Sequence, residues 1–225
     1  YDNSLIFSSE LKSFEIFRKD LKICQNSIQE YLSLSYIPAP KTIYENIFKL
    51  EPGCFLSLNL SLFNKFFFKG FVDIKKSKNI NTQIYWSPFL KKSLPSIGNS
   101  FQDYKKIIKK KIEGSVKDKM ISDVPIGVFL SGGIDSSLVA SIMRKYTTKN
   151  LNTFTISSEN SNFDEGQRAK EISNYLGANH HSFEVSRKQQ FEVINDLSSI
   201  YDEPFSDSSQ IPTIILSKYT KDYVK

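Results

Sequence analysis

The sequence predicts an α/β fold, in which a β-rich amino-terminal part precedes a parallel sheet that is covered by helices on both sides. Three observations support this prediction. After residue 100, short apolar runs alternate with stretches of helical periodicity. One of these runs, Val128–Leu130, stops at a pair of glycines, and a helical pattern begins directly after them. Before residue 72, short apolar and aromatic runs are instead separated by Pro and Gly.

The length and composition exclude several classes of protein. The 225 residues, 40% of them hydrophobic, suffice for one large or two modest domains. No run approaches the roughly 18 apolar residues of a membrane span and the first residues do not form a signal peptide, so we expect a cytoplasmic protein without a membrane partner. Cys24 and Cys54 have no nearby His, which predicts neither a disulfide nor a metal site. The net charge of +6 comes from lysines interleaved with acidic residues, so no nucleic-acid partner is expected.

The amino-terminal part is expected to contain short strands and one helix. Leu5–Phe7 is a candidate strand. Helical spacing over residues 26–35 predicts a helix that ends before Pro38. Residues 47–58 alternate around a Pro-Gly pair, which predicts two short strands joined by a turn.

A linker is expected after the aromatic stretch at residues 63–72. This stretch is interleaved with lysines, and it fits a half-buried strand better than the alternative, a surface that stacks on single-stranded bases. The polar residues 75–83 lack any period, which is typical of a linker. We therefore expect one domain over 1–72, a linker over 73–99 and a second domain over 100–225.

Beyond residue 100, helices and strands alternate as in proteins with a parallel sheet. The pattern predicts a helix over 101–116 with a solvated lysine face, strands at 126–130, 151–156 and 180–185, and helices that include 165–176, 191–200 and 211–215. Ligands of such sheets bind at the carboxyl ends of the strands. The turn after the first of these strands is therefore a candidate site.

That turn, Ser131–Ser137, has the composition of a phosphate-binding loop. It leads into a helix N-terminus, where unpaired backbone N–H groups and the helix dipole favour an anion. Gly132 and Gly133 allow a sharp bend, the serines add hydroxyl donors, and the carboxylate of Asp135 fits a site that also holds a cation such as Mg²⁺. The Walker and dinucleotide-binding motifs are absent from the sequence. The alternative is an ordinary Gly-rich turn without a ligand.

Polar residues near the end of the chain have two competing interpretations. They are Asp202, Glu203, Asp207, Ser208 and Ser209. Asp202, Glu203, Asp207 and Ser208 could position a substrate, but capping of the helix around residues 211–215 by Asp207, Ser208 or Ser209 is the favoured interpretation. His180 and His181 lie in a predicted strand, where packing or a satisfied hydrogen bond is expected rather than ligation.

At the turn, the sequence resembles the ATP pyrophosphatase group, whose Ser-Gly-Gly-x-Asp-Ser loop binds the pyrophosphate of ATP. The flanks resemble glutamine-hydrolysing asparagine synthetases through Asp-Val-Pro-Ile-Gly-Val-Phe-Leu at 123–130, Phe-Asp-Glu at 163–165, Tyr-Leu-Gly-Ala-Asn-His-His at 175–181 and Asp-Glu-Pro-Phe-Ser-Asp-Ser-Ser-Gln-Ile-Pro at 202–212. Stretches at 7–12, 36–45, 49–53 and 85–86 are similar to the segment that joins the glutaminase and synthetase domains of that family. The resemblance covers nearly the whole chain.

The resemblance implies a parallel-sheet domain of the adenine-nucleotide α-hydrolase-like fold, preceded by the β-rich end of an amino-terminal nucleophile glutaminase domain. It implies a ligase that uses ATP and Mg²⁺ to adenylate the side-chain carboxylate of aspartate and then amidates it with ammonia from glutamine. By motif match, pyrophosphate would be held by Ser131, Gly132, Gly133, Ser136 and Ser137, Mg²⁺ by Asp135, and adenosine would contact Leu130 and Ile156. The implied partners are these small molecules, with a homodimer as the assembly to consider for the full-length protein.

The sequence also departs from the family pattern. The family begins with a catalytic Cys, whereas this sequence begins with Tyr1, and the family's second ATP loop would follow Lys225. We therefore expect an interior fragment that is incomplete on its own. The alternatives are an amidotransferase that acts on another carboxylate such as a sugar acid, a tRNA-modifying ATP pyrophosphatase, and a non-catalytic nucleotide-binding module.

Overall fold

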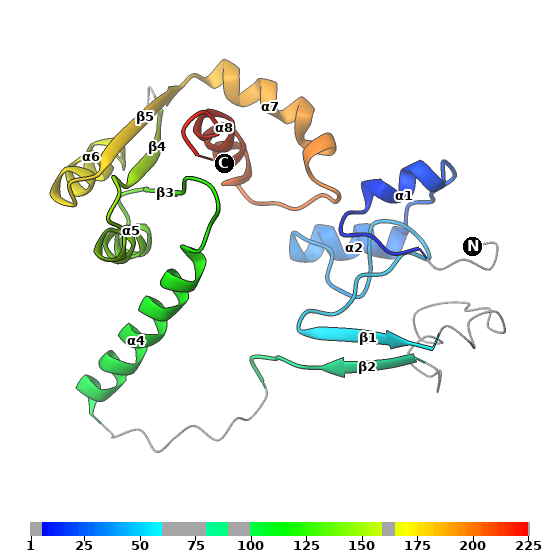
Figure 1. Ribbon diagram of the computed structural model, residues 1–225. Coiled ribbons are helices and arrows are strands. Elements are labelled where there is room, and N and C mark those ends of the chain that lie inside the picture. The colour runs from blue at the N-terminus through cyan, green and yellow to red at the C-terminus, as the bar shows by residue number, and fades with distance from the viewer. Residues whose placement is uncertain (1–5, 60–79, 90–99, 159–164, 225) are drawn as a thin grey trace. The chain divides into compact units, whose positions relative to one another are not determined.

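The computed structural model describes residues 6–59, 80–89, 100–158 and 165–224 (Figure 1). Contacts between residues divide the chain into two compact units. Unit 1 comprises Tyr1–Ser93 and Leu197–Asp207, and unit 2 comprises Leu94–Asp196 and Ser208–Lys225. Within the described residues, no helix combines the length and the apolar character that crossing a membrane requires.

In its described part, unit 1 has two helices and a pair of antiparallel strands. The helices are α1 (Lys12–Phe17) and α2 (Gln25–Leu34), and the strands are β1 (Cys54–Leu58) and β2 (Ile80–Ile84). Helix α2 confirms the helix predicted before Pro38. It ends at Ser35, which adopts a left-handed conformation with φ of 68°.

Two predictions for this unit are wrong. Ile6 and Phe7 belong to no strand, and the chain forms α1 shortly after them. The Pro52-Gly53 turn precedes β1, but β1 pairs with β2 and not with residues before the turn. Strand β2 lies within 73–99, the range expected to join two domains, and antiparallel pairing satisfies the backbone of this segment although its side chains are mostly polar. The aromatic stretch at 63–72 lies outside the described residues.

The segment Leu197–Asp207 belongs to unit 1, and Asp202 is one reason. Its carboxylate accepts hydrogen bonds from the N–H of Leu11 at 2.7 Å and from the N–H of Lys12 at 3.4 Å, where α1 begins. Asp202 therefore caps α1, a helix that is distant from it in the sequence. Ser209 is the N-cap residue of α8 (Gln210–Thr220), and its side chain makes no capping hydrogen bond.

Glu203 provides a second attachment of the same segment. One carboxylate oxygen accepts the N–H of Ile43 at 2.6 Å, and the other forms an ion pair with the ammonium of Lys49. The side chain of Glu203 is only 14% exposed, so little water screens this pair. Lys49 also donates to the carbonyl of Ile37 at 2.8 Å, which holds the ammonium in place.

Unit 2 alternates helices and strands, as predicted. Its elements are α4 (Phe101–Lys119), β3 (Gly127–Phe129), α5 (Ile134–Tyr146), β4 (Asn152–Ser158), α6 (Glu165–Tyr175), β5 (Asn179–Val185), α7 (Arg187–Ile200) and α8 (Gln210–Thr220); the last residues of α7 are counted with unit 1. Strands β3, β4 and β5 form a parallel sheet in that order. The predicted α/β fold with a parallel sheet is confirmed (Figure 1).

Helices cover both faces of this sheet. Side chains alternate along β4, so Thr153 and Phe154 point to opposite faces. The hydroxyl of Thr153 lies 2.9 Å from that of Ser173 in α6. On the other face, the ring of Phe154 packs against Tyr223, just beyond α8, with the ring centroids 5.7 Å apart. His181 stacks on the same Phe154 ring, which confirms the packing role predicted for this histidine.

Helix α4 confirms the predicted amphipathic helix. Its N-cap is Ser100, whose hydroxyl oxygen accepts the N–H of Asp103 at 3.2 Å. Exposed side chains make up the predicted lysine face, which consists of Lys105, Lys106, Lys109 and Lys110. This face is therefore solvated, as predicted.

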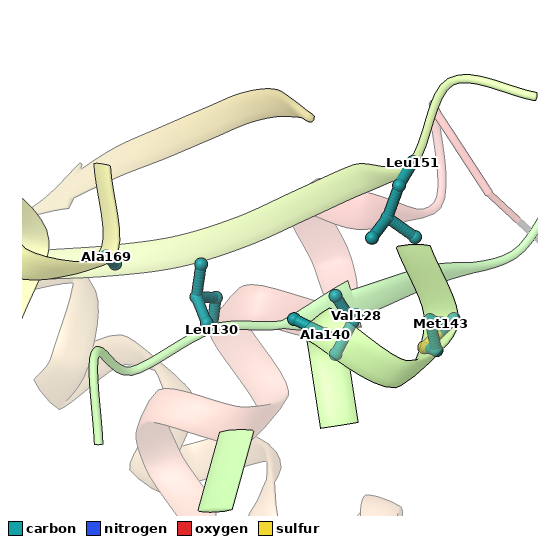
Figure 2. Close-up of a cluster of buried hydrophobic side chains, with 6 residues drawn as sticks. All are labelled: Val128, Leu130, Ala140, Met143, Leu151 and Ala169. Atoms are coloured by element: carbon teal, nitrogen blue, oxygen red, sulfur yellow. The ribbon is translucent and has the colours of Figure 1, made fainter. Parts of the chain in front are cut away.

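The core of unit 2 holds the beginning of the candidate loop. Figure 2 shows its cluster of buried side chains, which come from the β3 strand and its end, from α5, from the residue before β4 and from α6: Val128, Leu130, Ala140, Met143, Leu151 and Ala169. The side chain of Leu130 is 1% exposed. Because Leu130 directly precedes Ser131, its burial fixes the point at which the chain leaves the sheet and enters the loop.

Candidate nucleotide-binding site

The turn between β3 and α5 presents a helix N-terminus that has no side-chain cap. Gly133 is the N-cap residue of α5, with an extended backbone, and it has no side chain that could accept from the first N–H groups. Gly132 precedes it with a φ of 74°, a left-handed conformation that residues with a Cβ adopt only with strain. The amides of the first turn of α5 and the helix dipole can therefore act on an anion.

Three serine hydroxyls converge at this helix N-terminus. The Oγ atoms of Ser131 and Ser136 lie 3.1 Å apart, and the N–H of Ser131 donates to Ser136 Oγ at 3.2 Å. The hydroxyl of Ser137 donates to the carbonyl of Gly133 at 2.6 Å. The structure thus brings the predicted phosphate-binding residues together in one turn, in which hydroxyls can rotate from each other toward an incoming phosphate.

Asp135 lies in the first turn of α5 with its side chain exposed. Its negative charge suits the positive end of the helix dipole, but it repels a phosphate unless a cation lies between them. Among the residues that the structure describes, no group of three or more His, Cys, Asp or Glu could hold a metal ion. A single carboxylate beside hydroxyls nevertheless fits Mg²⁺, because this ion typically takes one or two carboxylates and fills its shell with substrate phosphates and water. The donor set therefore fits a metal that binds together with a nucleotide.

Leu130 and Ile156, the residues expected to border adenosine, lie on neighbouring strands. Leu130 follows β3 directly, and its N–H donates to the carbonyl of Phe154 in β4 at 2.8 Å. Its side chain belongs to the core. Ile156 is half-buried and lies two residues beyond Phe154 in β4. Both residues are thus toward the carboxyl ends of adjacent parallel strands, where ligands of such sheets bind.

Thr155 supports the turn although the loop motif does not include it. Its side chain is 2% exposed, and its hydroxyl donates to the carbonyl of Leu130. A signal for this residue is present in the sequence, since a Thr in a buried strand needs an acceptor for its hydroxyl. The sequence does not say which acceptor it finds, because that depends on the pairing of β3 with β4.

Comparisons with known proteins match both parts of the chain. The family model described as asparagine synthase matches residues 108–225, and the model of a glutamine amidotransferase domain matches residues 1–65. A putative glutamine-hydrolyzing asparagine synthetase of Methanocaldococcus jannaschii is 36% identical over 230 aligned residues, which cover 99% of this chain and 40% of the relative. Asparagine synthetase 1 of Bacillus subtilis, also described as glutamine-hydrolyzing, is 30% identical over 226 residues, which cover 99% of this chain and 32% of the relative.

The chain therefore spans less than half the length of these relatives. Among solved structures, the NMN synthetase from Francisella tularensis matches 52% of this chain and 50% of its own chain, with 22% sequence identity and a TM-score of 0.37. The amidotransferase match at residues 1–65 falls within the part of the sequence that resembles the end of a glutaminase domain.

Proposed function

Because the chain belongs to the asparagine synthase family, we propose that it carries the ATP-binding part of a glutamine-dependent asparagine synthetase. The observation that supports this proposal most directly is the turn between β3 and α5. It combines a helix N-terminus without a side-chain cap, three converging serine hydroxyls and one exposed carboxylate. This combination suits the binding of a polyphosphate with its cation.

The proposed reaction has two steps, and the turn serves the first. A side-chain carboxylate oxygen of aspartate attacks the α-phosphorus of ATP, and the bond to the bridging oxygen breaks as pyrophosphate leaves. Ammonia then attacks the activated carbonyl carbon, and AMP leaves with the electron pair of the broken bond to give asparagine. Negative charge grows on pyrophosphate during the first step, so donors placed around it lower the barrier of that step.

Each residue of the turn has a proposed role in that step. The backbone N–H groups at Gly132 and Gly133 and the start of α5, with the hydroxyls of the three serines, donate to the pyrophosphate oxygens. Asp135 holds Mg²⁺, which neutralises part of the phosphate charge when it is bound. Leu130 and Ile156 border the adenosine.

The remaining assignments concern the rest of the protein. We propose that residues 1–72 are the carboxyl-terminal part of a glutaminase domain, which supplies ammonia from glutamine, that 73–99 join the domains, and that 100–225 begin the synthetase domain. We also propose a cytoplasmic enzyme that forms a homodimer. Light scattering on the purified full-length protein tests the assembly.

Exchange of labelled pyrophosphate into ATP by the full-length protein tests the proposed reaction. We expect exchange that requires aspartate and Mg²⁺, and formation of asparagine when glutamine or ammonium is added. Exchange that requires a sugar acid and not aspartate would assign the protein to an amidotransferase with another substrate. Absence of exchange with every carboxylate would overturn the proposed adenylation.

A further inference from the structure

Both backbone polar groups of Leu130 are held by β4 before the loop begins. The N–H of Leu130 donates to the carbonyl of Phe154 at 2.8 Å, and the carbonyl of Leu130 accepts the hydroxyl of Thr155. Both partners are in β4, although the loop itself follows β3. The first bond is part of the parallel sheet, whereas the second depends on one side chain.

The bond from Thr155 acts on the loop through the geometry of the peptide group. The carbonyl of Leu130 and the N–H of Ser131 belong to the same planar, rigid unit. Fixing the direction of the carbonyl therefore fixes the direction of the N–H. That N–H donates to Ser136 Oγ at 3.2 Å, and Ser136 Oγ is also 3.1 Å from Ser131 Oγ. A hydroxyl in β4 is thus connected by covalent geometry to the hydroxyl cluster at the start of α5.

We propose that Thr155 is a positioning residue for the phosphate-binding turn, setting the orientation of its first backbone amide. This inference rests on the proposed function, because it assumes that the turn binds the phosphates of ATP. In this role Thr155 acts on the turn through the Leu130–Ser131 peptide group. Burial strengthens the effect, since at 2% exposure no water can replace the lost hydroxyl without a rearrangement.

The substitution that tests this role is Thr155→Val in the full-length protein. Val has nearly the shape of Thr and favours strands equally, but it leaves the Leu130 carbonyl without its donor. We expect the dissociation constant of Mg²⁺-ATP, measured by isothermal titration calorimetry, to rise about tenfold, the size expected for loss of one buried hydrogen bond. Thr155→Ser retains the hydroxyl, and its binding should return to within about twofold of the parent.

Thr153→Val is the matched control. Thr153 is also buried in β4, and its hydroxyl bonds to Ser173 and His180 and not to the loop. This variant should lower the melting temperature but leave ATP affinity unchanged. If it weakens ATP binding as much as Thr155→Val does, the effect is one of general stability and the inference is overturned.

The ATP affinities of the parent and of the Thr155 variants separate the positioning role of Thr155 from the proposed function. Equal ATP affinity of the parent and Thr155→Val, or failure of Thr155→Ser to restore affinity, overturns the positioning role and leaves the proposed function intact. A folded parent that binds no Mg²⁺-ATP overturns the proposed function and the inference with it. If Thr155→Val does not fold, Thr155→Cys replaces it, because a thiol is a weaker donor than a hydroxyl. Thr155→Cys should then bind ATP more weakly than Thr155→Ser, and equal affinities of these two variants overturn the inference.

Discussion

Lys12 and Asp202 join the beginning of one helix to the end of another. Asp202 accepts the backbone N–H of Lys12 at the start of α1. The ammonium of Lys12 donates in turn to the carbonyls of Ser199 and Ile200, each at 3.3 Å, in the last residues of α7. The Asp202 carboxylate thus satisfies N–H groups at the start of α1, and the Lys12 ammonium satisfies carbonyls at the end of α7. Neither helix can satisfy these groups internally. The reciprocal arrangement favours a specific attachment of this segment in unit 1.

Replacing Asp202 should loosen this attachment. Asp202→Ala removes the acceptor for two N–H groups of α1 and should lower the free energy of unfolding by about 1 to 2 kcal/mol. Urea unfolding of the purified protein measures the change. Asp202→Asn retains an acceptor oxygen and should lose less, and Asp222→Ala removes an exposed carboxylate as a matched control. A loss no larger than that of the control would show that the cap contributes nothing.

Glu203 and Lys49 should be energetically coupled. Glu203→Gln leaves the ammonium of Lys49 beside a neutral side chain and should lower the free energy of unfolding by about 1 to 3 kcal/mol. Lys49→Met should do the same, but the double variant should lose clearly less than the sum, because the pair can be lost only once. A double-mutant cycle in urea provides the coupling free energy. Simple additivity would mean that the ion pair does not form in solution.

His180 should make stability depend on pH. Its Nδ1 lies 2.9 Å from the Thr153 hydroxyl, and its Nε2 is buried without a hydrogen-bond partner among the described residues. Burial, followed by the charges of His181 and Lys170, lowers the pKa of His180 below its ordinary value of 6.5. The unfolded chain therefore binds a proton that the folded chain resists, so the free energy of unfolding falls as the pH drops from 6.5 to the lowered pKa.

Thermal unfolding in buffers from pH 7.5 downward measures this dependence. The parent should lose stability below pH 6.5, and His180→Gln should lose correspondingly less over the same interval. His181→Gln is the control and should retain most of the parent's slope. A slope that is the same in the parent and in His180→Gln would assign the dependence to other groups.

Asp135 should separate the two proposed half-reactions. Asp135→Ala removes the carboxylate expected to hold Mg²⁺ and should reduce aspartate-dependent pyrophosphate exchange by at least roughly a hundredfold in the full-length protein. Glutamine hydrolysis should persist, since it is assigned to the other domain. Asp118→Ala, at an exposed position of α4, is the matched control. Undiminished exchange would remove Asp135 from the site.

Gly132 should tolerate no side chain without loss of ATP affinity. Its φ of 74° makes Gly132→Ala strained by about 1 kcal/mol or more, and relief of that strain would move the turn. Calorimetric titration should show weaker Mg²⁺-ATP binding. Gly114→Ala is the contrasting variant: a Cβ in the middle of α4 meets nothing within 4 Å, so this change should stabilise the helix by about 0.5 to 1 kcal/mol. Unchanged affinity in Gly132→Ala would show that the turn adapts.

The elements of unit 2 are predictable because each has a local signal. Helix α4 has an apolar period and a Ser cap, and β4 contains Thr-Phe-Thr-Ile, four residues that favour strands. The loop Ser131–Ser137 is recognisable from adjacent residues alone. Its ordering into a turn with converging hydroxyls follows from local chain geometry.

Long-range pairings are what the sequence does not reveal. Strand β2 has only polar residues between its terminal isoleucines, and it becomes a strand because β1 pairs with it across a long separation. The hydrogen bond from Leu11 to Asp202 joins residues that are 191 positions apart in the sequence, and no local pattern specifies a contact over such a separation. The role of Thr155 cannot be predicted for the same reason, since its acceptor, the carbonyl of Leu130, directly follows another strand.

The discontinuity of unit 1 has a consequence for the order in which the protein is made. Residues 1–93 leave the ribosome before residues 197–207, which complete their unit, and about a hundred residues of unit 2 are synthesised in between. Asp202 lies 191 residues beyond Leu11, so at roughly 5 to 20 residues per second the start of α1 waits about 10 to 40 seconds for the carboxylate that caps it. Nascent unit 1 thus cannot form its final contacts until most of unit 2 has been synthesised. The folding of unit 1 during translation therefore depends on the synthesis of unit 2.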